Sequence, residues 1–301
     1  MLRQFKISVI IVNWNGTEDT IECINSLKNV SYENLNLIVV DNNSDESQKK
    51  KLIEFVNDTD ITLILNKDNS GFAGGNNIGI RKALENQSDY ILLLNNDTTV
   101  DKDFLLPLLK IFESESNCGI VSPIINYYSK PDKVWSAGGK ISKIRGSGFA
   151  VTNIKSRNLS EKIREVSFVS GCCMLIKSEV FHKIGLFDED FFLYVEDTDF
   201  CVRTKKAGYR IFVASTSTIY HKVSNSTSRA NNPLPLYYMT RNRLYLVKKH
   251  FPKYLTLTFI YIFGSMLLKF LLWILRGKFK NIQFVLLSFK DFFINKKGKV
   301  F

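Results

Sequence analysis

Three carboxylates lie within four positions near the middle of the chain, directly after an aromatic run. Glu196, Asp197 and Asp199 follow the segment Phe191-Phe192-Leu193-Tyr194. Apolar neighbours and like charges both raise the pKa of a carboxyl group, so one of these acids can accept a proton from a hydroxyl near neutral pH. Acids are also common in the first turn of a helix, where they meet the positive end of the helix dipole. Taken alone, the segment fits a catalytic base and a solvated helix start equally well.

A second acidic element favours the catalytic interpretation. Asp97 ends the run Leu92-Leu93-Leu94-Asn95-Asn96, in which an apolar strand-like stretch turns polar. A carboxylate in such a place suits a hard divalent cation, although one aspartate makes a weak metal site. His221, one of three histidines in the chain, is the candidate second ligand. A lone histidine is more often structural.

The first 125 residues alternate short apolar runs with helix-like segments. Strands are expected at residues 7–12, 36–41, 61–65 and 90–95, and helices at residues 18–27, 47–57 and 76–85. This alternation predicts a parallel sheet covered by helices, and strands this apolar are typical of strands buried on both faces. Ligands bind beyond the carboxyl ends of strands in such sheets, so the polar residues that follow the strands are expected at one site.

The second half is less regular at first. Residues 131–162 contain four glycines among polar and basic residues, which indicates a loop or hairpin region. A strand is then expected at residues 166–176, helices at 178–184 and 196–207, and a strand at 210–213, with Gly208 as a helix C-cap. Arg241 and Arg243 fit either contacts with a diphosphate or a surface helix.

Two segments in the first half suit a nucleotide. Asp41 can accept the imide N–H of a uracil or thymine ring, although the residues after it also form good turn chemistry. The segment NSGFAGGNN at residues 69–77 allows close approach of the backbone, and amides exposed at the start of a helix favour phosphate. No GxGxxG follows the first strand, which disfavours a nicotinamide dehydrogenase.

The composition excludes several classes of protein. A chain of 301 residues with 45% hydrophobic side chains can form a substantial core, as one large domain or two small ones. The five cysteines contain no CxxC pair, so neither a disulfide framework nor a zinc site is indicated, and a reducing cytoplasm is the simpler compartment. The first apolar stretch, residues 7–12, is too short for a signal peptide.

The net charge of +12 is unevenly distributed. From Arg241 onward there are thirteen Lys or Arg residues and a single acid, Asp291. The same segment contains residues 254–275, whose only formal charge is Lys269. A basic tail with a long apolar stretch favours an anionic membrane surface over nucleic acid.

Three arrangements of this terminal segment remain open. A helix over residues 254–275 would be roughly 33 Å long, enough to cross a bilayer, but Lys269 near its centre would cost about 2.5–3.5 kcal/mol. Residues 282–293 place five apolar side chains on one stripe among lysines, which is typical of an interfacial helix; these are Ile282, Val285, Leu286, Phe289 and Phe293. Attachment to one face of a membrane ranks first, ahead of a span and of a soluble helical subdomain or homo-oligomer contact.

Several motifs then follow one another in a recognisable order. They are SVIIVNWNG at 8–16, VVDNNSD at 39–45, NSGFAGGNN at 69–77, LLLNND at 92–97, GCCMLIKSEVF at 171–181 and GLFDEDFFLYVEDTDFCVR at 185–203, with His221 beyond them. In this order they resemble family 2 glycosyltransferases, especially bacterial rhamnosyltransferase-like and galactofuranosyltransferase-like members. The resemblance covers roughly residues 5–250.

The resemblance implies an α/β protein with the GT-A fold, a Rossmann-like and mostly parallel sheet flanked by helices. An apolar, basic helical extension would follow it. Residues 1–250 would form the catalytic domain, with a nucleotide-binding half to about residue 125 and an acceptor and catalytic half at 126–250. Residues 251–301 would be a C-terminal membrane-associating segment.

The resemblance also implies roles for individual residues. Asp197 matches the catalytic base, with Glu196 and Asp199 positioning acceptor or base, and Asp41 would read the pyrimidine. Asp97 and His221 would bind Mn2+ or Mg2+, although the acidic DxD signature of the family appears here as Asn95-Asn96-Asp97 and lacks its first acid. The remaining residues expected to bind the donor are Asn13, Asn15, Asn43, Gly71, Phe72, Ala73, Asn76, Asn95 and Asn96.

The implied function is an inverting glycosyl transfer from a nucleotide diphosphate sugar, with dTDP-rhamnose as first choice and a UDP-hexose such as UDP-galactofuranose next. The acceptor would be a hydroxyl of a cell-surface polysaccharide or of a glycan linked to polyprenyl diphosphate. The enzyme would be cytoplasmic, peripheral to the inner face of the cell membrane, with no nucleic-acid partner. Two alternatives remain. One is a nucleotidyltransferase that forms sugar nucleotides, but the glycine-rich, lysine-containing N-terminal loop of such enzymes is absent here. The other is a non-catalytic binding protein, which would not need Asp97, Asp197 and His221.

Overall fold

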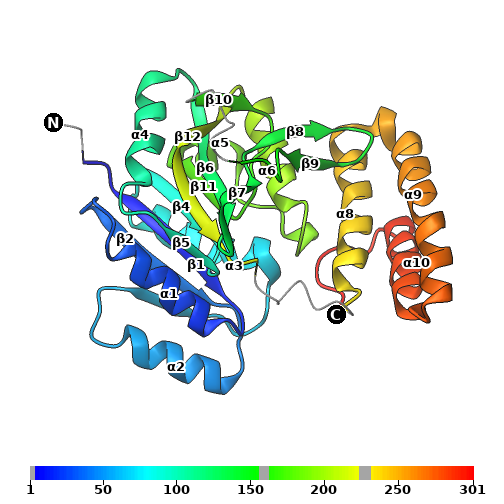
Figure 1. Cartoon of the computed structure of the whole chain (residues 1–301), viewed down its shortest axis with the longest axis horizontal. Helices are drawn as coiled ribbons and strands as arrows, with labels where there is room; N and C mark the ends of the chain where they lie inside the picture. The colour runs from blue at the N-terminus through cyan, green and yellow to red at the C-terminus, as the bar shows by residue number, and fades with distance from the viewer. Residues whose placement is uncertain (1–3, 156–162, 224–231) are drawn as a thin grey trace.

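The computed structural model describes residues 4–155, 163–223 and 232–301. A ten-stranded mixed sheet forms the centre of the molecule, and three helices lie side by side at one end (Figure 1). The main strand order is β10-β12-β6-β11-β4-β1-β2-β3, with β5 paired to β12 and β7 paired to β6.

The first half of the chain forms the parallel part of this sheet. Strand β1 pairs in parallel with β2 and β4, and β2 pairs in parallel with β3. The elements are β1 (Ile7–Asn13), α1 (Thr17–Leu27), β2 (Leu35–Asp41), α2 (Glu46–Val56), β3 (Thr62–Leu65), α3 (Gly71–Glu85) and β4 (Tyr90–Leu94). The expected parallel α/β sheet is therefore confirmed, although α3 begins five residues before the predicted helix start.

The second half adds a mixed part to the sheet. Strand β11 pairs antiparallel with β4 and β6, whereas β12 and β6 are parallel. The elements are β5 (Thr98–Val100), α4 (Leu105–Ser114), β6 (Cys118–Tyr127), β7 (Lys130–Ser136), β8 (Gly139–Ser142), β9 (Ser147–Ala150), β10 (Ile163–Val166), β11 (Cys173–Lys177), α5 (Ser178–Ile184), the 3-10 turn η2 (Glu189–Phe191), α6 (Glu196–Lys206) and β12 (Arg210–His221).

Three sequence expectations differ from this part of the structure. The single strand expected at residues 166–176 is wrong, because β10 and β11 are separate strands joined by a turn that contains Gly171. Strand β12 continues to His221 instead of ending at 213. The predicted loop or hairpin region holds β7 and the β8–β9 hairpin, and its end, residues 156–162, lies outside the described residues.

Each face of the sheet carries its own hydrophobic cluster. On one face α1, α2 and α4 pack through side chains that include Ile24, Leu52 and Leu108. On the other face α3, α5 and α6 pack through side chains that include Ile80 and Phe200. Since β1 and β4 contribute to both clusters, the strands that end at the expected site are fixed from both sides.

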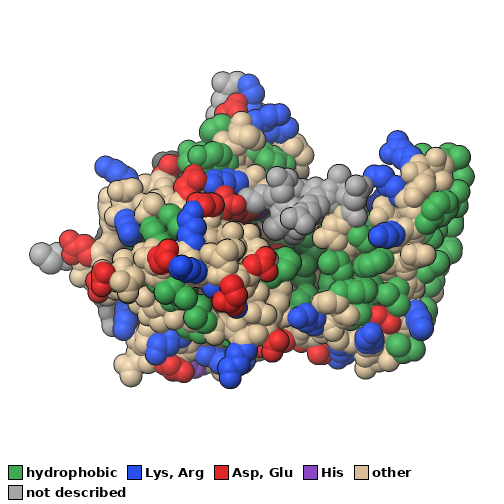
Figure 2. All heavy atoms as spheres, turned by 90° about the horizontal axis from the view of Figure 1, so that it is seen from below, with side chains coloured by type: hydrophobic (Ala, Val, Ile, Leu, Met, Phe, Trp, Pro, Cys, Tyr) green, Lys and Arg blue, Asp and Glu red, His purple; other side chains and the backbone are tan. Residues whose placement is uncertain are grey.

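The C-terminal end consists of α8 (Leu234–His250), the 3-10 turn η3 (Pro252–Tyr254), α9 (Leu255–Leu275) and α10 (Phe279–Phe293). Both α9 and α10 pack against α8, and hydrophobic side chains gather along the outer edge of this end of the molecule (Figure 2). Pro252–Leu275 is the one helical segment in the described residues that is long and apolar enough to cross a membrane. Only 17% of its most apolar 18-residue stretch is buried inside the protein.

The five side chains of the apolar stripe predicted for residues 282–293 do not form a single exposed face. Val285 is fully buried and Phe289 nearly so, in a cluster with Leu244 of α8 and Ile262 of α9. Leu286 and Phe293 are exposed. The stripe is divided because α10 turns one side toward α8 and keeps the other side outside.

Asp199 joins this end of the molecule to α6. Its carboxylate is fully buried, accepts a hydrogen bond from Arg203 Nε at 2.7 Å and lies 2.7 Å from His250 Nε2 and 2.8 Å from Lys249 Nζ. Burial alone would raise the pKa of Asp199, but the hydrogen bond from His250 and the charges of Arg203 and Lys249 hold it well below its usual range. The expectation that Asp199 positions the acceptor or the base is not supported, because its oxygens are taken by Arg203, Lys249 and His250.

Replacing Asp199 with asparagine should lower the free energy of unfolding by about 3 kcal/mol at neutral pH, because the fully buried anion shared by Arg203, Lys249 and His250 is removed. The folded-state pKa of Asp199 lies below its unfolded value of about 3.9, so the stabilisation is present above that value and is lost as the pH falls through the folded pKa. Urea titrations at neutral pH and at about pH 3 measure both effects. Glu46→Gln, in an exposed pair with Lys49, is the control and should change little; equal losses in both variants would contradict the assignment.

Candidate active site

Four loops that follow parallel strands meet at one edge of the sheet. At the end of β1, the Asn13 amide donates to Asp41 Oδ1 at 2.9 Å and to Ser44 Oγ at 3.2 Å. Asp41 Oδ2 accepts a hydrogen bond from the Ser44 backbone N–H, and Ser44 Oγ accepts one from the Asn15 N–H. Asn13 and Asp41 are fully buried. Asp41 therefore ties the loops after β1 and β2 together, and its expected contact with a pyrimidine remains a prediction.

Asn42, which the sequence analysis did not select, performs the same task for the next loop. Its Nδ2 donates to the carbonyl of Gly71 and to Asn69 Oδ1, while its Oδ1 accepts from Asn66 Nδ2 and from the Ser70 N–H. The signal that could have identified it is its position directly after β2, where polar residues face the strand ends. The amide fixes the entry into α3.

The start of α3 is closed by a distant carbonyl group. Gly71 has φ +71°, and a Cβ atom there would overlap the carbonyl oxygen of Phe192. The N–H groups of Phe72 and Ala73 donate to that same oxygen, at 2.8 and 3.4 Å. The expectation that these amides are exposed for phosphate is therefore wrong for this conformation. Asn76 and Asn77 are also buried, and Asn77 binds both the N–H and the carbonyl group of Phe187.

The loop before α6 has an unusual backbone. Phe192, Tyr194 and Val195 all have positive φ, at 60°, 69° and 76°. Such conformations cost on the order of 1–3 kcal/mol each for residues other than glycine, and they persist only where surrounding contacts impose them. Val195 is the N-cap residue of α6, so the strained loop sets the place where Glu196 and Asp197 begin the helix.

Asp197 is held by backbone and side-chain donors. Its Oδ2 accepts from the Gly171 N–H at 3.1 Å, and its Oδ1 accepts from the Thr198 N–H at 2.6 Å and from Thr198 Oγ1 at 3.2 Å. Burial raises the pKa of Asp197, against these hydrogen bonds, which lower it. A half-buried carboxylate with a raised pKa and a fixed direction is suited to proton transfer.

Glu196 beside it is in a different state. It is 5% exposed, and its Oε2 is buried without a hydrogen-bond partner in the described part of the chain. Burial and the neighbouring charge of Asp197 raise its pKa well above the ordinary value. Burial of Glu196 therefore favours its neutral form.

The NND segment lies next to Asp197. The Asn95 N–H donates to the carbonyl of Cys172, one residue after the Gly171 amide that binds Asp197. Asn96 Nδ2 donates to the Gly16 carbonyl and to Thr20 Oγ1 at the start of α1. Both side chains are half-buried. The structure thus brings the predicted base and the predicted metal segment to one place on the sheet edge.

Asp97 and His221 are in direct contact. Asp97 Oδ1 lies 3.0 Å from His221 Nε2, both residues are buried, and His221 meets the indole of Trp135 edge to face. Ligand atoms on neighbouring positions of an octahedral Mg2+ ion are about 3 Å apart, so the two side chains fit as a pair of ligands. No group of three or more His, Cys, Asp or Glu residues that could hold an ion occurs within residues 4–155, 163–223 and 232–301. A metal here would need oxygen atoms from a ligand as well.

The other predicted residues lie around this centre. Asn15 and Asn43 are exposed at the tips of their loops, and Phe72 is half-buried against Gly171. Arg241 neither reaches a diphosphate nor lies on the surface, because it is fully buried and donates to the carbonyl of Gly298. Arg243 donates to the carbonyl of Arg145. Asn242, between them, was not selected; it lies in α8, and a helix was one of the two interpretations of the Arg241–Arg243 segment.

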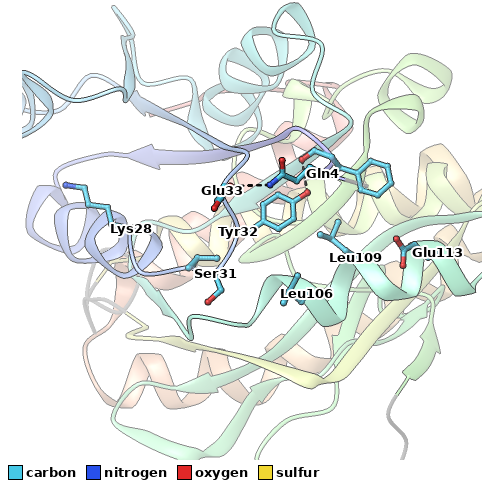
Figure 3. A pocket seen from close by; sticks show the side chains of 10 residues that line it. Gln4, Lys28, Ser31, Tyr32, Glu33, Leu106, Leu109 and Glu113 are labelled. Atoms are coloured by element: carbon cyan, nitrogen blue, oxygen red, sulfur yellow. Dashed lines mark hydrogen bonds between the residues drawn. The ribbon is translucent and has the colours of Figure 1, made fainter. Parts of the chain in front are cut away.

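A separate depression lies away from this edge. It has a volume of about 710 Å³ and is lined by residues near the amino end of β1 and on α4, among them Phe5, Tyr32 and Leu109 (Figure 3). Gln4 Nε2 donates to Glu33 and Tyr32 OH donates to the Phe5 carbonyl across it. Because it lies at the amino ends of the strands, it is opposite to Asp41 and Asp97 and does not belong to the site.

Residues 8–185 match the family described as Glycosyl transferase family 2. The chain belongs to this family. It is 30% identical over 250 residues to the low-salt glycan biosynthesis hexosyltransferase Agl10 of Haloferax volcanii, covering 82% of this chain and 77% of that protein. It is 24% identical to the dTDP-rhamnosyl transferase RfbF of Shigella flexneri, covering 83% of each. It is 28% identical to the rhamnosyltransferase WbbL of Escherichia coli, covering 68% of this chain and 79% of that protein.

The crystal structure of residues 1–349 of Staphylococcus aureus TarS has a similar fold. The TM-score is 0.54 at 18% identity, and the likeness covers 82% of this chain and 66% of that one. The GT-A fold expected from the sequence is confirmed, and the chain is a glycosyltransferase of family 2 similar to rhamnosyl- and hexosyltransferases.

Gly71→Ala tests the contact between α3 and the strained loop. The new methyl group would overlap the Phe192 carbonyl and force a positive φ on alanine, so we expect a loss of about 2 kcal/mol in the free energy of unfolding. Gly264→Ala is the matched control, because a Cβ atom there has open space within a helix; it should be neutral or stabilise by about 0.5–1 kcal/mol. Thermal unfolding of both variants measures the two changes in stability. An unchanged stability of Gly71→Ala would contradict the close contact between Gly71 and the Phe192 carbonyl.

Proposed function

We propose that this glycosyltransferase is an inverting, metal-dependent enzyme whose base is Asp197. The observation that carries the proposal is the placement of Asp197: its two oxygens are held by Gly171 and Thr198, on the segment that also binds Asn95 of the NND motif. The raised pKa of Asp197 and its fixed direction support a proton acceptor.

The reaction would be a single displacement. The acceptor oxygen attacks the anomeric carbon from the face opposite the nucleotide, the bond between that carbon and the phosphate oxygen breaks, and the nucleoside diphosphate leaves. The hydroxyl proton passes to Asp197. Configuration at the anomeric carbon is inverted, and no covalent intermediate on the enzyme is required.

Asp97 and His221 would hold the divalent cation, Mn2+ or Mg2+. When bound, the ion would neutralise charge that develops on the leaving diphosphate. The separation of the two side chains and their burial at the strand ends support this role. Asn95, in place of an acid, would lie near the ribose or the sugar as a neutral polar group.

The donor is proposed to be dTDP-rhamnose, with a UDP-hexose as second choice. Two of the named relatives are rhamnosyltransferases and one is a hexosyltransferase, which supports a hexose donor. Asn13, Asn15, Asp41 and Asn43 would form the nucleotide side of the pocket. Phe72 and Asn76 lie across it.

The acceptor is proposed to be a polysaccharide or a glycan on a polyprenyl diphosphate, met at the cytoplasmic face of the cell membrane. Agl10, whose name places it in glycan biosynthesis, supports this class of acceptor. Residues 1–250 would carry catalysis, and residues 251–301 would attach the enzyme to that surface, supported by the exposed apolar residues of α9.

Nucleotide release by the purified full chain against dTDP- and UDP-sugars, with Mn2+, Mg2+ or EDTA, tests the proposal. We expect metal-dependent turnover of one donor, at least about 100-fold slower in Asp197→Asn and Asp97→Ala. Nucleotide binding by calorimetry should survive in Asp197→Asn, because this residue acts on the acceptor. Glu46→Gln is the matched surface control.

Near-normal turnover by Asp197→Asn would overturn its role as base. Binding of sugar nucleotides without turnover, even with membrane extract as the source of acceptor, would favour the non-catalytic binding protein. Release of diphosphate from a nucleoside triphosphate and a sugar phosphate would favour the nucleotidyltransferase.

A further inference from the structure

Helix α9 has two unlike sides. Thr258, Ile262 and Met266 form a buried stripe against α8 and α10. On the opposite side, at spacings of three, eight, three and four residues, lie side chains that are 50–75% exposed; these are Leu257, Ile260, Leu268, Leu271 and Leu275. A contiguous exposed row of this size marks a surface that another apolar phase covers.

Exposed cations without carboxylate partners lie on α9 and at the start of α10. Lys269, Arg276 and Lys280 are exposed, and none of them has an ion pair within the described residues. Lys269 follows Met266 by three residues and Arg276 follows Thr258 by 18, so both project from the same side of α9 as the buried stripe and not from the outward row. On α10, Leu286 and Phe293 are exposed beside Lys290.

The packing of α9 decides its orientation. Thr258 Oγ1 donates to the Lys143 carbonyl in the β8–β9 turn, and α9 lies along α8 and α10 (Figure 1). A bilayer-spanning α9 would carry the helices packed along it into the hydrocarbon, with the exposed Lys248 of α8 and Lys290 of α10, and charged groups are excluded from that depth. A helix that lies in the interface avoids this conflict.

We propose that the outward row of α9, with Leu286 and Phe293 of α10, lies flat in one leaflet of an anionic lipid membrane. The inference rests on the proposed function for its choice of a membrane surface and specifies how the chain meets it. Acidic headgroups would face Lys280 and Lys290 of α10, and acyl chains would cover the leucines.

Flotation of the full chain with vesicles tests the docking without any transfer assay, so failure of the docking and failure of the proposed reaction are separate results. With phosphatidylglycerol in phosphatidylcholine vesicles, we expect flotation that falls at high salt and falls about tenfold or more in the double variant Leu268→Glu, Leu271→Glu. Ile53→Glu, at an exposed isoleucine of α2, is the control and should float like the wild type.

Depth measurement separates a flat helix from a span. All five native cysteines are buried, so a fluorophore reacts at a new thiol in Ile260→Cys, Leu268→Cys or Leu275→Cys. Quenching by lipids brominated at different depths should place all three labels alike. A central label much deeper than the outer two would overturn the flat arrangement. A stable dimer in solution with no flotation would assign the row to a second copy of the chain.

A different observation concerns Asn242, in the interior of α8. Its Nδ2 lies within 2.7–2.9 Å of the carbonyl oxygens of Phe191, Leu193 and Tyr194, and its Oδ1 accepts from Arg241 Nε. These carbonyl groups belong to the loop of positive φ that precedes Glu196. The two N–H donors of this amide are therefore shared among three carbonyl oxygens of the loop.

We infer that Asn242 is a positioning residue for the transfer. It fixes the backbone conformation of residues 191–195. In that conformation the Phe192 carbonyl accepts hydrogen bonds from the first N–H groups of α3, and Val195 is the N-cap residue of α6, two positions before Asp197. Relaxation of this loop would move the proposed base relative to the acceptor while the nucleotide side of the site, built on β1 and β2, stays in place.

Asn242→Ala and Asn242→Ser, measured well below their melting temperatures, test the inference. We expect kcat to fall about 10- to 100-fold in the alanine variant and less in the serine variant, whose hydroxyl can still donate to one carbonyl. The dissociation constant for the nucleotide should change less than about threefold. Amide hydrogen exchange at Phe72 and Ala73 should accelerate, a readout that needs no activity.

Ser178→Ala is the control, because it removes a buried hydrogen bond to the Ser88 carbonyl at the opposite edge of the sheet. At matched melting temperature it should keep kcat and leave exchange at Phe72 unchanged. Equal kcat and equal exchange in Asn242→Ala and Ser178→Ala would overturn the positioning role.

Discussion

The backbone between Phe191 and Val195 is the constraint on which the arrangement of the site depends. Three of its residues hold positive φ, a conformation that none of their side chains favours. The strain is offset by contacts from three directions. The Phe192 carbonyl accepts from the start of α3, Asn242 donates to three loop carbonyls, and Asp190 at the loop entrance accepts the Gly298 N–H. The start of α3, the acidic helix and the C-terminal end therefore meet at one short segment.

This junction makes the C-terminal end part of the catalytic architecture. Lys297 pairs with Asp190, the Val300 N–H donates to Tyr238, and Arg241 donates to the Gly298 carbonyl. On the other side of α6, the turn of the β8–β9 hairpin is held by Arg243 and Thr258, and the Gly148 N–H of that hairpin donates to Thr198. Contacts from α8, α9 and the last residues thus reach both flanks of Asp197. A membrane that fixes α9 would fix these contacts as well.

The parallel half of the sheet could be predicted from sequence because its signals are local. Apolar runs ending in Asn13, Asp41 and Asp97 indicate both the strands and the edge at which their polar ends meet. The loop conformation could not be predicted, since Phe192, Tyr194 and Val195 carry no turn signal and are held only by tertiary contacts. The same holds for Asp199, whose sequence neighbours suggest catalysis whereas distant Lys249 and His250 determine its ion pairs. The amides of Phe72 and Ala73 were expected to be free because their acceptor, Phe192, is 120 positions away in the chain.

The acidic pair shows how such contacts separate two residues of like chemistry. Glu196 and Asp197 are adjacent, and a charge on one disfavours a charge on the other, so their titration belongs to the pair. Asp197 accepts three hydrogen bonds from Gly171 and Thr198, whereas Glu196 Oε2 has no donor in the described part of the chain. These hydrogen bonds favour ionisation of Asp197 over ionisation of Glu196. Burial nevertheless raises the pKa of Asp197, which suits a proton acceptor. The division of roles follows from hydrogen-bond donors supplied by the turn at Gly171, and not from the sequence of the acidic motif itself.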